Sequence, residues 1–189
     1  MRTQKTQRMY FMGTYKIAIL LIQYPDPMAT FMTRWTRFRY THATIGLGED
    51  LNTFYSFVHK GFIIEKVTRY LKPGREPFPC ALYEITVPPS IYRHIKKLLR
   101  AYAARKSSLH YTRLGLVLSL MLRIPYQRRD HYFCSQFVAE VLQRSQAAHL
   151  PRKSMLYFPK DFHKLKETNL VFTGNLQTMA EHYHLLGSN

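Results

Sequence analysis

The chain has 189 residues, a formal net charge of +17 at pH 7, and 46% hydrophobic and 14% aromatic residues. This length and apolar content suit one folded domain with a sizeable core and exclude an intrinsically disordered chain. The charge predicts attraction to polyanions such as nucleic acid, anionic lipid or acidic glycan, but it does not bear on the fold.

The first part of the chain predicts an arm, a buried strand and a short helix. Residues 1–14 are basic and predict a poorly ordered arm, so we expect the single domain to occupy 15–176. Lys16–Gln23 is rich in isoleucine and leucine and is followed by two prolines, which is typical of a buried strand that ends in a turn. Met28–Phe38 has apolar residues at helical spacing and predicts a short amphipathic helix.

The apolar run within this first strand also bears on the compartment. Residues 17–22 follow a basic start, as in a secretory signal, but the run is short and no small-residue cleavage site follows it. A membrane-spanning helix needs about 20 apolar residues, and no stretch of the sequence qualifies. The sequence therefore predicts a cytoplasmic protein.

The middle of the chain predicts a β-hairpin and a loop. Tyr40–Leu47 and Thr53–Val58 are rich in strand-forming residues and are separated by turn residues, which is the pattern of a hairpin. Gly61–Pro79 contains several proline and glycine breakers. We interpret it as a long surface loop, with a short strand near Phe62–Glu65 as an alternative.

Three elements are expected after this loop. Ala81–Val87 predicts another strand, and a helix with one apolar and one basic face is expected from Pro88 to about Ala104. Arg113–Ile124 is the most apolar segment of the chain and begins and ends close to arginines. We interpret it as a core helix. The alternative is a membrane-seeking helix, because flanking arginines would suit anionic lipid.

The C-terminal part begins with a helix from Cys134 to about Arg144, whose first residue points to the inward face. A helical turn at Pro159–Phe162 and a last strand at Leu170–Thr173 follow. Residues 177–189 predict a loosely ordered tail. Strands and helices alternate without a regular βαβ rhythm, so the expected class is α+β.

Cys134 is the residue that points most directly to chemistry. Basic residues precede it, and helix N-terminal N–H groups and positive neighbours both favour the nucleophilic thiolate. Such a cysteine also needs a base, which His42 on its predicted strand could supply. The bland interpretation is an inert buried cysteine and a strand histidine with satisfied ring nitrogens. Cys80 precedes a strand and is interpreted as structural; a single bridge between the two cysteines is the alternative to reduced thiols.

Three segments carry a family resemblance: Thr41–Leu47 (THATIGL), Phe54–Phe57 (FYSF) and Tyr132–Val138 (YFCSQFV). Together they resemble the circularly permuted branch of the NlpC-type papain-like superfamily, in which the histidine strand precedes the cysteine helix. The lecithin:retinol acyltransferase-like group belongs to the same broad set, and the resemblance is greatest to uncharacterised bacterial members. It spans roughly residues 16–175.

The resemblance implies a small antiparallel sheet packed on helices, with Cys134 as nucleophile and His42 as base. The third polar residue of the family lies on the strand after the histidine, which places it near Ser56 in this sequence. A backbone N–H at the start of the cysteine helix would act as an oxyanion donor. The residues expected to line the substrate site are Tyr132, Ser135 and Gln136.

The resulting expectation is a cysteine hydrolase (peptidase or amidase) or acyl transferase. It would act on an amide or ester of a peptide or lipid through an acyl-enzyme, with no cofactor. The alternative is a catalytically weak or inactive basic module that binds nucleic acid or an anionic membrane surface. Serine is a weak orienting group, and this weakness and the charge favour the alternative.

Specific nucleic-acid recognition and metal binding have little support in the sequence. Basic and aromatic residues are interleaved over 93–129, but they form no recognisable nucleic-acid motif. Of the nine histidines only His182 and His184 lie close together, and no cysteine or carboxylate cluster completes a metal site.

Overall fold

The computed structural model describes residues 13–24, 33–34, 36–72, 74 and 76–186. Residues 1–12 of the arm predicted at 1–14, and most of the helix predicted at Met28–Phe38, lie outside these residues.

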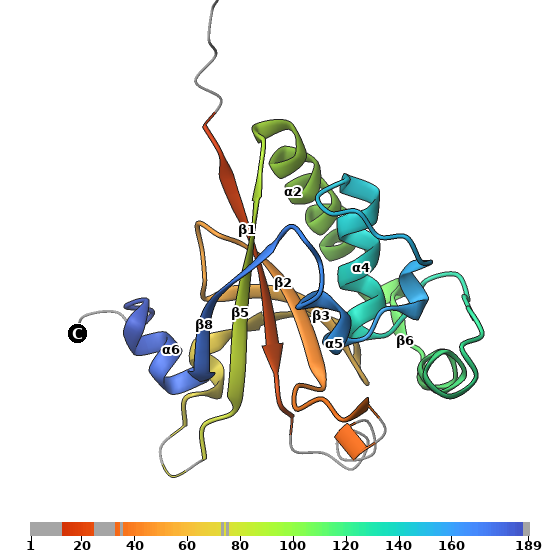
Figure 1. Ribbon diagram of the computed structural model, residues 1–189, viewed down its shortest axis with the longest axis horizontal. Helices are drawn as coiled ribbons and strands as arrows, with labels where there is room; N and C mark the ends of the chain where they lie inside the picture. Colours follow the sequence, from red (N-terminus) through yellow and green to blue (C-terminus); the bar gives the residue numbers. More distant parts are fainter. Residues whose placement is uncertain (1–12, 25–32, 35, 73, 75, 187–189) are drawn as a thin grey trace, which may run out of the picture.

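A six-stranded antiparallel sheet forms the centre of the molecule, in the order β4-β3-β2-β1-β5-β8 (Figure 1). The strands are β1 (Tyr15–Ile22), β2 (His42–Leu47), β3 (Thr53–Val58), β4 (Gly61–Lys66), β5 (Pro79–Val87) and β8 (Thr168–Asn175).

Both faces of the central strand β1 are buried. Alternate side chains point to opposite faces of a strand. Ile17, Ile19 and Leu21 therefore belong to one core cluster, and Ala18 and Leu20 belong to the other. A strand covered on both sides has no need for polar alternation, which explains the unbroken apolar run in the sequence.

Helices cover the two faces of the sheet separately. On one face, α2 (Pro89–Ala104) and α4 (Cys134–Ser145) bury Ile95, Leu99 and Phe137 in the larger cluster (Figure 1). On the opposite face, α6 (Leu176–His182) packs beside the short 3-10 helix η1 (Val67–Tyr70). A further 3-10 turn, η4 (Ser154–Leu156), packs against α4, and the single helical turn α5 (Pro159–Phe162) follows it.

A separate excursion of the chain leads into α4. After the turn η2 (Lys106–Ser108), the two-residue strands β6 (His110–Tyr111) and β7 (His131–Tyr132) pair in parallel. The chain between them forms α3 (Arg113–Val117) and a π-helical turn, η3 (Leu118–Leu122). No helix among the described residues is long and apolar enough to cross a membrane.

The α+β class and most elements predicted from the sequence are confirmed. The loop predicted at Gly61–Pro79 is wrong in its first part, and the alternative, a short strand near Phe62–Glu65, is confirmed, because Gly61–Lys66 pairs along its whole length with β3. Apart from Gly61, at the start of the strand, the glycine and prolines of this segment all follow Tyr70, so they do not interrupt that pairing.

The C-terminal region also differs from expectation. Residues 176–182 form α6, whereas the sequence predicted a loosely ordered tail from 177. Leu176, Met179 and Ala180 lie on one helical face and are fully buried against the sheet. Asn175 caps the helix by accepting a hydrogen bond from the Thr178 N–H at 2.9 Å. The buried stripe and the cap together stabilise this segment.

The apolar segment 113–124 is only partly a core helix. Leu116 and Leu120 are buried, but Leu114 and Leu122 remain 57% and 61% exposed. The segment therefore has one face in the core and one face in solvent.

Candidate active site

Cys134 and His42 lie together in the fold, although they are 92 positions apart in the sequence. His42 is the first residue of β2, and Cys134 is the first residue of α4. Both side chains are buried, and the thiol and the imidazole are hydrogen-bonded to each other.

The second nitrogen of the imidazole contacts a carboxylate. The Nε2 atom of His42 lies 2.8 Å from Oε1 of Glu65, which is buried on β4. Because Nε2 is occupied by Glu65, Nδ1 is left to face the sulfur of Cys134. The order of the three groups is therefore thiol, imidazole and carboxylate, which is the arrangement of a nucleophile, a base and a group that orients the base.

The ionisation of the pair follows from this arrangement. Burial alone would lower the pKa of His42, but the Glu65 carboxylate and the hydrogen bond to Cys134 raise it to about 10. Burial alone would raise the pKa of Cys134, but the His42 hydrogen bond and charge, with the backbone N–H groups of Ala43 and Ser135, lower it. The geometry therefore favours a thiolate–imidazolium pair.

Two tyrosines hold the carboxylate of Glu65 in place. The Tyr70 hydroxyl donates to Oε2 at 2.7 Å, and the Tyr24 hydroxyl lies 3.5 Å from the same oxygen. The two hydroxyls are also hydrogen-bonded to each other, and the Tyr24 ring packs edge-on against His42. Burial and the Glu65 charge raise the pKa of both phenols, so they remain protonated donors.

Ser56, the residue expected to orient the histidine, contacts a different group. Its hydroxyl donates to the backbone carbonyl of Ala43 at 2.7 Å, and the side chain is fully buried. The β2–β3 register joins only Ile45 with Tyr55 and Gly46 with Phe54, so the strands are not paired in register at Ala43. The Ser56 hydroxyl therefore replaces a missing backbone hydrogen bond at the Ala43 carbonyl. The contact that orients His42 comes from Glu65 instead.

The expected substrate-site residues all lie next to Cys134, but their side chains are buried. Tyr132 packs against Phe57 and Tyr102 in the core. Ser135 and Gln136 are fully buried, and their side-chain polar atoms have no hydrogen-bond partner among the described residues. Ser135 contributes through its backbone N–H, which is hydrogen-bonded to the Cys134 sulfur.

The backbone at the start of α4 is also arranged for anion binding. No side chain caps this helix, whose N-cap residue is Phe133, and the first intrahelical bond runs from the Phe137 N–H to the Phe133 carbonyl. N–H groups in an uncapped first turn can donate to an anion. They lie at Cys134 itself, where an oxyanion would form.

Cys80 provides a contrast with Cys134. It is a free, buried thiol on β5 without a charged partner, and burial raises its pKa to about 12. The same protein therefore contains one thiol that is activated by its neighbours and one that is suppressed by burial.

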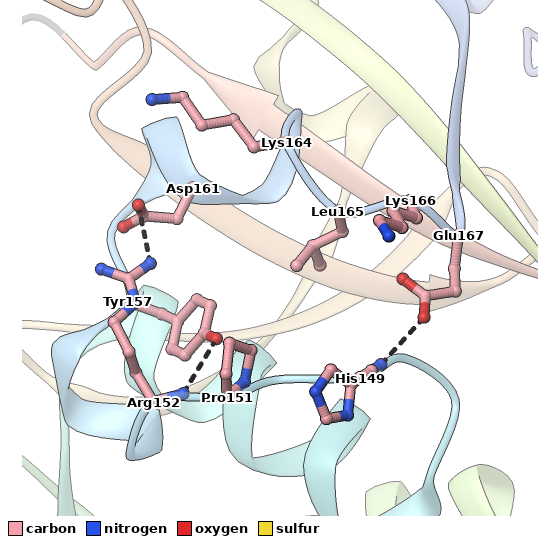
Figure 2. Close-up of a pocket in the computed structure, with 9 residues that line it drawn as sticks. All are labelled: His149, Pro151, Arg152, Tyr157, Asp161, Lys164, Leu165, Lys166 and Glu167. Atoms are coloured by element: carbon pink, nitrogen blue, oxygen red, sulfur yellow. Dashed lines mark hydrogen bonds and ion pairs between the residues drawn. The ribbon is translucent and has the colours of Figure 1, made fainter.

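A cleft of the described surface lies elsewhere, beyond the C-terminal end of α4. Figure 2 shows this cavity of about 300 Å³, in which Arg152 pairs with Asp161 at 2.9 Å and its guanidinium stacks on Tyr157. The His149 N–H donates to Glu167 at 3.0 Å. Neither Cys134 nor His42 lines this cleft. The candidate active site is therefore the group of residues around the start of α4.

Glu65 is the functional residue that sequence reasoning missed. It lies in the segment interpreted mainly as a surface loop, where an acidic residue needs no explanation. The signal that could have found it is a carboxylate at the end of an apolar run, Phe62–Ile64, on the second strand after His42. Among the described residues, no group of three or more His, Cys, Asp or Glu could hold a metal ion.

The sequence matches no protein-family model and no curated protein.

Proposed function

We propose that the protein is a cysteine hydrolase or acyl transferase of the permuted papain-like type. The observation that carries the proposal is the buried chain of Cys134, His42 and Glu65, with a 2.8 Å contact between imidazole and carboxylate. A buried charge on Glu65 is costly unless it is paired and hydrogen-bonded. A catalytic role explains this cost, because the Glu65 carboxylate orients the His42 imidazole and stabilises its protonated form.

The chemistry proceeds in two halves. The Cys134 thiolate attacks the carbonyl carbon of an amide or ester, forming a C–S bond while the carbonyl π electrons move to oxygen. The tetrahedral intermediate collapses, and the leaving nitrogen or oxygen takes the proton of the His42 imidazolium. Water or another nucleophile then gives a proton to His42, attacks the thioester and displaces the Cys134 thiolate.

Two further groups support this sequence of steps. Glu65 stabilises the imidazolium and fixes the ring, while the tyrosine hydroxyls keep the carboxylate from rotating. The uncapped N–H groups at the start of α4 are positioned to donate to the oxyanion. Loss of a single oxyanion donor costs about a hundredfold or more in other enzymes.

The alternative, a basic module without catalysis, loses its main argument at this site. That argument is the weakness of Ser56 as an orienting group for the histidine. Glu65 supplies a charged group in that role instead. The net charge of +17 remains and suits a second role alongside catalysis.

Trapping of the acyl-enzyme tests the proposal. The wild-type protein should be acylated by an activated nitrophenyl ester at Cys134, as mapped by peptide mass spectrometry, with a burst of nitrophenol. Cys134→Ala should abolish the burst, whereas Cys80→Ala, the matched control, should retain it. Acylation at Cys80, or a burst that survives Cys134→Ala, would refute Cys134 as the nucleophile.

A further inference from the structure

The excursion formed by α3 and η3 is apolar on both of its sides. On the inner side, Leu116 and Leu120 are buried in a cluster with Phe133, Met155 and Phe158. On the outer side, four large apolar side chains are 44–61% exposed: Leu114, Met121, Leu122 and Ile124. A helix that is hydrophobic all round is normally buried, either in a protein core or in a membrane.

This concentration of exposed apolar side chains is not typical of the rest of the described surface. Nine large hydrophobic residues are exposed there, and four of them lie within 114–124. Single exposed apolar residues need no explanation, but a contiguous patch rimmed by polar groups marks an interaction site.

The rim of this patch is basic. Arg113, Arg123, Arg128 and Arg129 are all exposed and lie within or just after the segment. Asp130 is the only acidic residue in this part of the chain, and Arg105 and Arg129 contact it at 2.6 and 3.7 Å. The other three arginines of the rim form no ion pair among the described residues, so the excursion presents apolar side chains and unpaired positive charge together.

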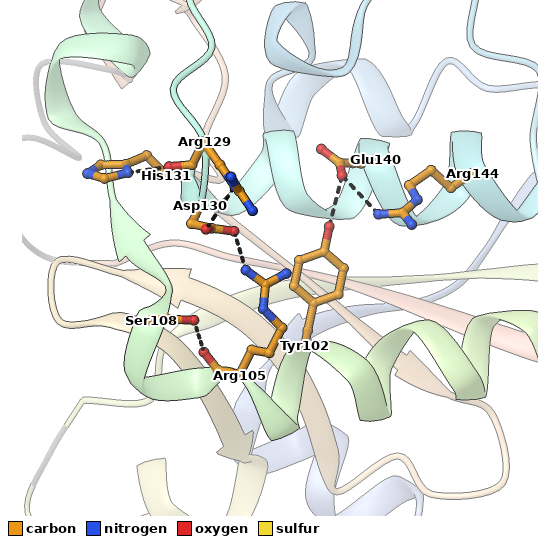
Figure 3. Close-up of polar contacts among 8 residues, drawn as sticks. All are labelled: Tyr102, Arg105, Ser108, Arg129, Asp130, His131, Glu140 and Arg144. Atoms are coloured by element: carbon orange, nitrogen blue, oxygen red, sulfur yellow. Dashed lines mark hydrogen bonds and ion pairs between the residues drawn. The ribbon is translucent and has the colours of Figure 1, made fainter.

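The excursion is fixed at its base. Figure 3 shows the Arg105–Asp130 ion pair, and the nearby contact of His131 Nδ1 with the Arg129 carbonyl at 2.8 Å. The His110 N–H donates to the Asp130 carbonyl at 2.8 Å, which closes the start of the excursion onto its end. These contacts hold the excursion while its outer face projects into solvent.

We propose that the outer face of α3 and η3 docks on an anionic lipid bilayer. Leucine, methionine and isoleucine side chains would enter the boundary between headgroups and acyl chains, and the arginines would contact lipid phosphates. Nucleic acid would satisfy the arginines but leave the apolar side chains in water. A second copy packed face to face would bury the apolar side chains but bring like charges together. A bilayer with anionic lipid accommodates both features.

Docking would bring the start of α4 close to the membrane surface. Phe133, which immediately precedes Cys134, packs against Leu116 and Leu120 on the inner side of the same excursion. This consequence rests on the proposed function and favours substrates whose amide or ester bond lies at a membrane surface. The docking itself does not depend on the chemistry of Cys134.

Flotation of the full chain with vesicles tests the docking surface. We expect flotation with vesicles of phosphatidylcholine and phosphatidylserine, and much less with phosphatidylcholine alone. Leu122→Ser should lower the affinity about tenfold, since one large apolar side chain is no longer buried. Arg123→Gln should lower it about fivefold, the effect of one basic residue near an anionic surface.

Two matched controls separate this surface from the general charge of the protein. Leu170→Ser removes a side chain that is 55% exposed on β8, and Arg93→Gln removes an exposed charge on α2. Leu170→Ser should leave vesicle affinity unchanged, and Arg93→Gln should reduce it less than Arg123→Gln. Cys134→Ala should float like the wild type, so a failure of the proposed chemistry is distinguishable from a failure of docking.

Three results would overturn the proposal. One is absence of flotation with anionic vesicles at low salt. Another is an equal loss of affinity in Leu122→Ser and Leu170→Ser, or no loss in either. The third is a dimer in sedimentation velocity that Leu122→Ser dissociates, which would assign the face to a second copy of the chain.

Discussion

At the residue scale, the site depends on a carboxylate that acts through another residue. Glu65 does not contact the thiol; it contacts the imidazole that contacts the thiol. Its charge, together with the contact to Cys134, raises the pKa of the buried His42 to about 10. The strength of the base and the acidity of the thiol should therefore both depend on a group that sequence reasoning did not single out.

Glu65→Gln tests this dependence, because the amide keeps the shape but removes the charge. The pKa of His42 should fall, since its folded-state value is held up by that charge, and the pKa of Cys134 should rise with the loss of imidazolium. We expect kcat/KM for a nitrophenyl ester to fall about a hundredfold or more, and the pH midpoint of Cys134 alkylation to move upward. Glu84→Gln, which removes another buried carboxylate of the sheet, should leave both unchanged. An unaltered alkylation midpoint in Glu65→Gln would exclude the orienting role.

Ser56→Ala should lower the stability of the protein and leave the reactivity of Cys134 unchanged. The Ser56 hydroxyl satisfies the Ala43 carbonyl inside the core, so its loss should lower the free energy of unfolding by about 1–3 kcal/mol. The pH dependence of Cys134 alkylation should stay close to that of the wild type, because Ser56 does not contact His42. Urea denaturation and alkylation kinetics measure the two effects separately. A large shift of the alkylation midpoint without loss of stability would instead support Ser56 as the orienting residue.

At the scale of elements, two short segments carry more structure than their sequence suggested. Strand β4 brings Glu65 to the site, and α6 covers the second face of the sheet. The position of α6 depends on packing against distant strands, which local patterns do not contain. Strand β4 instead follows β3 through a tight turn, with Val58 opposite Gly61. The helix α4 and strand β2, by contrast, have clear periodicity and were predicted close to their observed bounds.

The packing of α6 gives a stability prediction. Met179 is fully buried, so Met179→Ala should lower the free energy of unfolding by about 2–5 kcal/mol. Gln177→Ala, an exchange on the same helix at a partly exposed position, should change it by less than about 0.5 kcal/mol. Equilibrium unfolding in urea measures both values. If the two variants were equally stable, residues 176–182 would be a loosely ordered tail after all.

At the scale of the whole molecule, the net charge of +17 acts on stability as well as on binding. It arises from 28 lysines and arginines against 11 acidic residues, so there are too few acidic residues to pair with every positive side chain. Self-repulsion of a highly charged chain opposes the compact state. The melting temperature should therefore rise as sodium chloride screens the charges, which calorimetry at increasing ionic strength would measure. A melting temperature that falls with salt would mean that the ion pairs outweigh the repulsion.

The sequence predicted the α+β class and the residues Cys134 and His42, because a helix start and a strand have local signatures. It did not predict the partner of His42, which depends on the register of β4 against β3. That register pairs Phe54 with Glu65 and Ser56 with Ile63. It also could not decide which side of 113–124 is buried, since both sides are apolar and only the tertiary structure distinguishes them.

The most direct test of the account is the pH dependence of cysteine alkylation by iodoacetamide, with each modified residue mapped. Cys134 should react well below the ordinary thiol range near pH 8.5, since its pKa is lowered, whereas Cys80 should stay unreactive until about pH 12. His42→Gln retains a donor for Glu65 but removes the imidazolium, so it should shift Cys134 above the ordinary range. If Cys134 reacts as a plain or buried thiol in both proteins, the thiolate–imidazolium pair does not exist and the catalytic proposal fails.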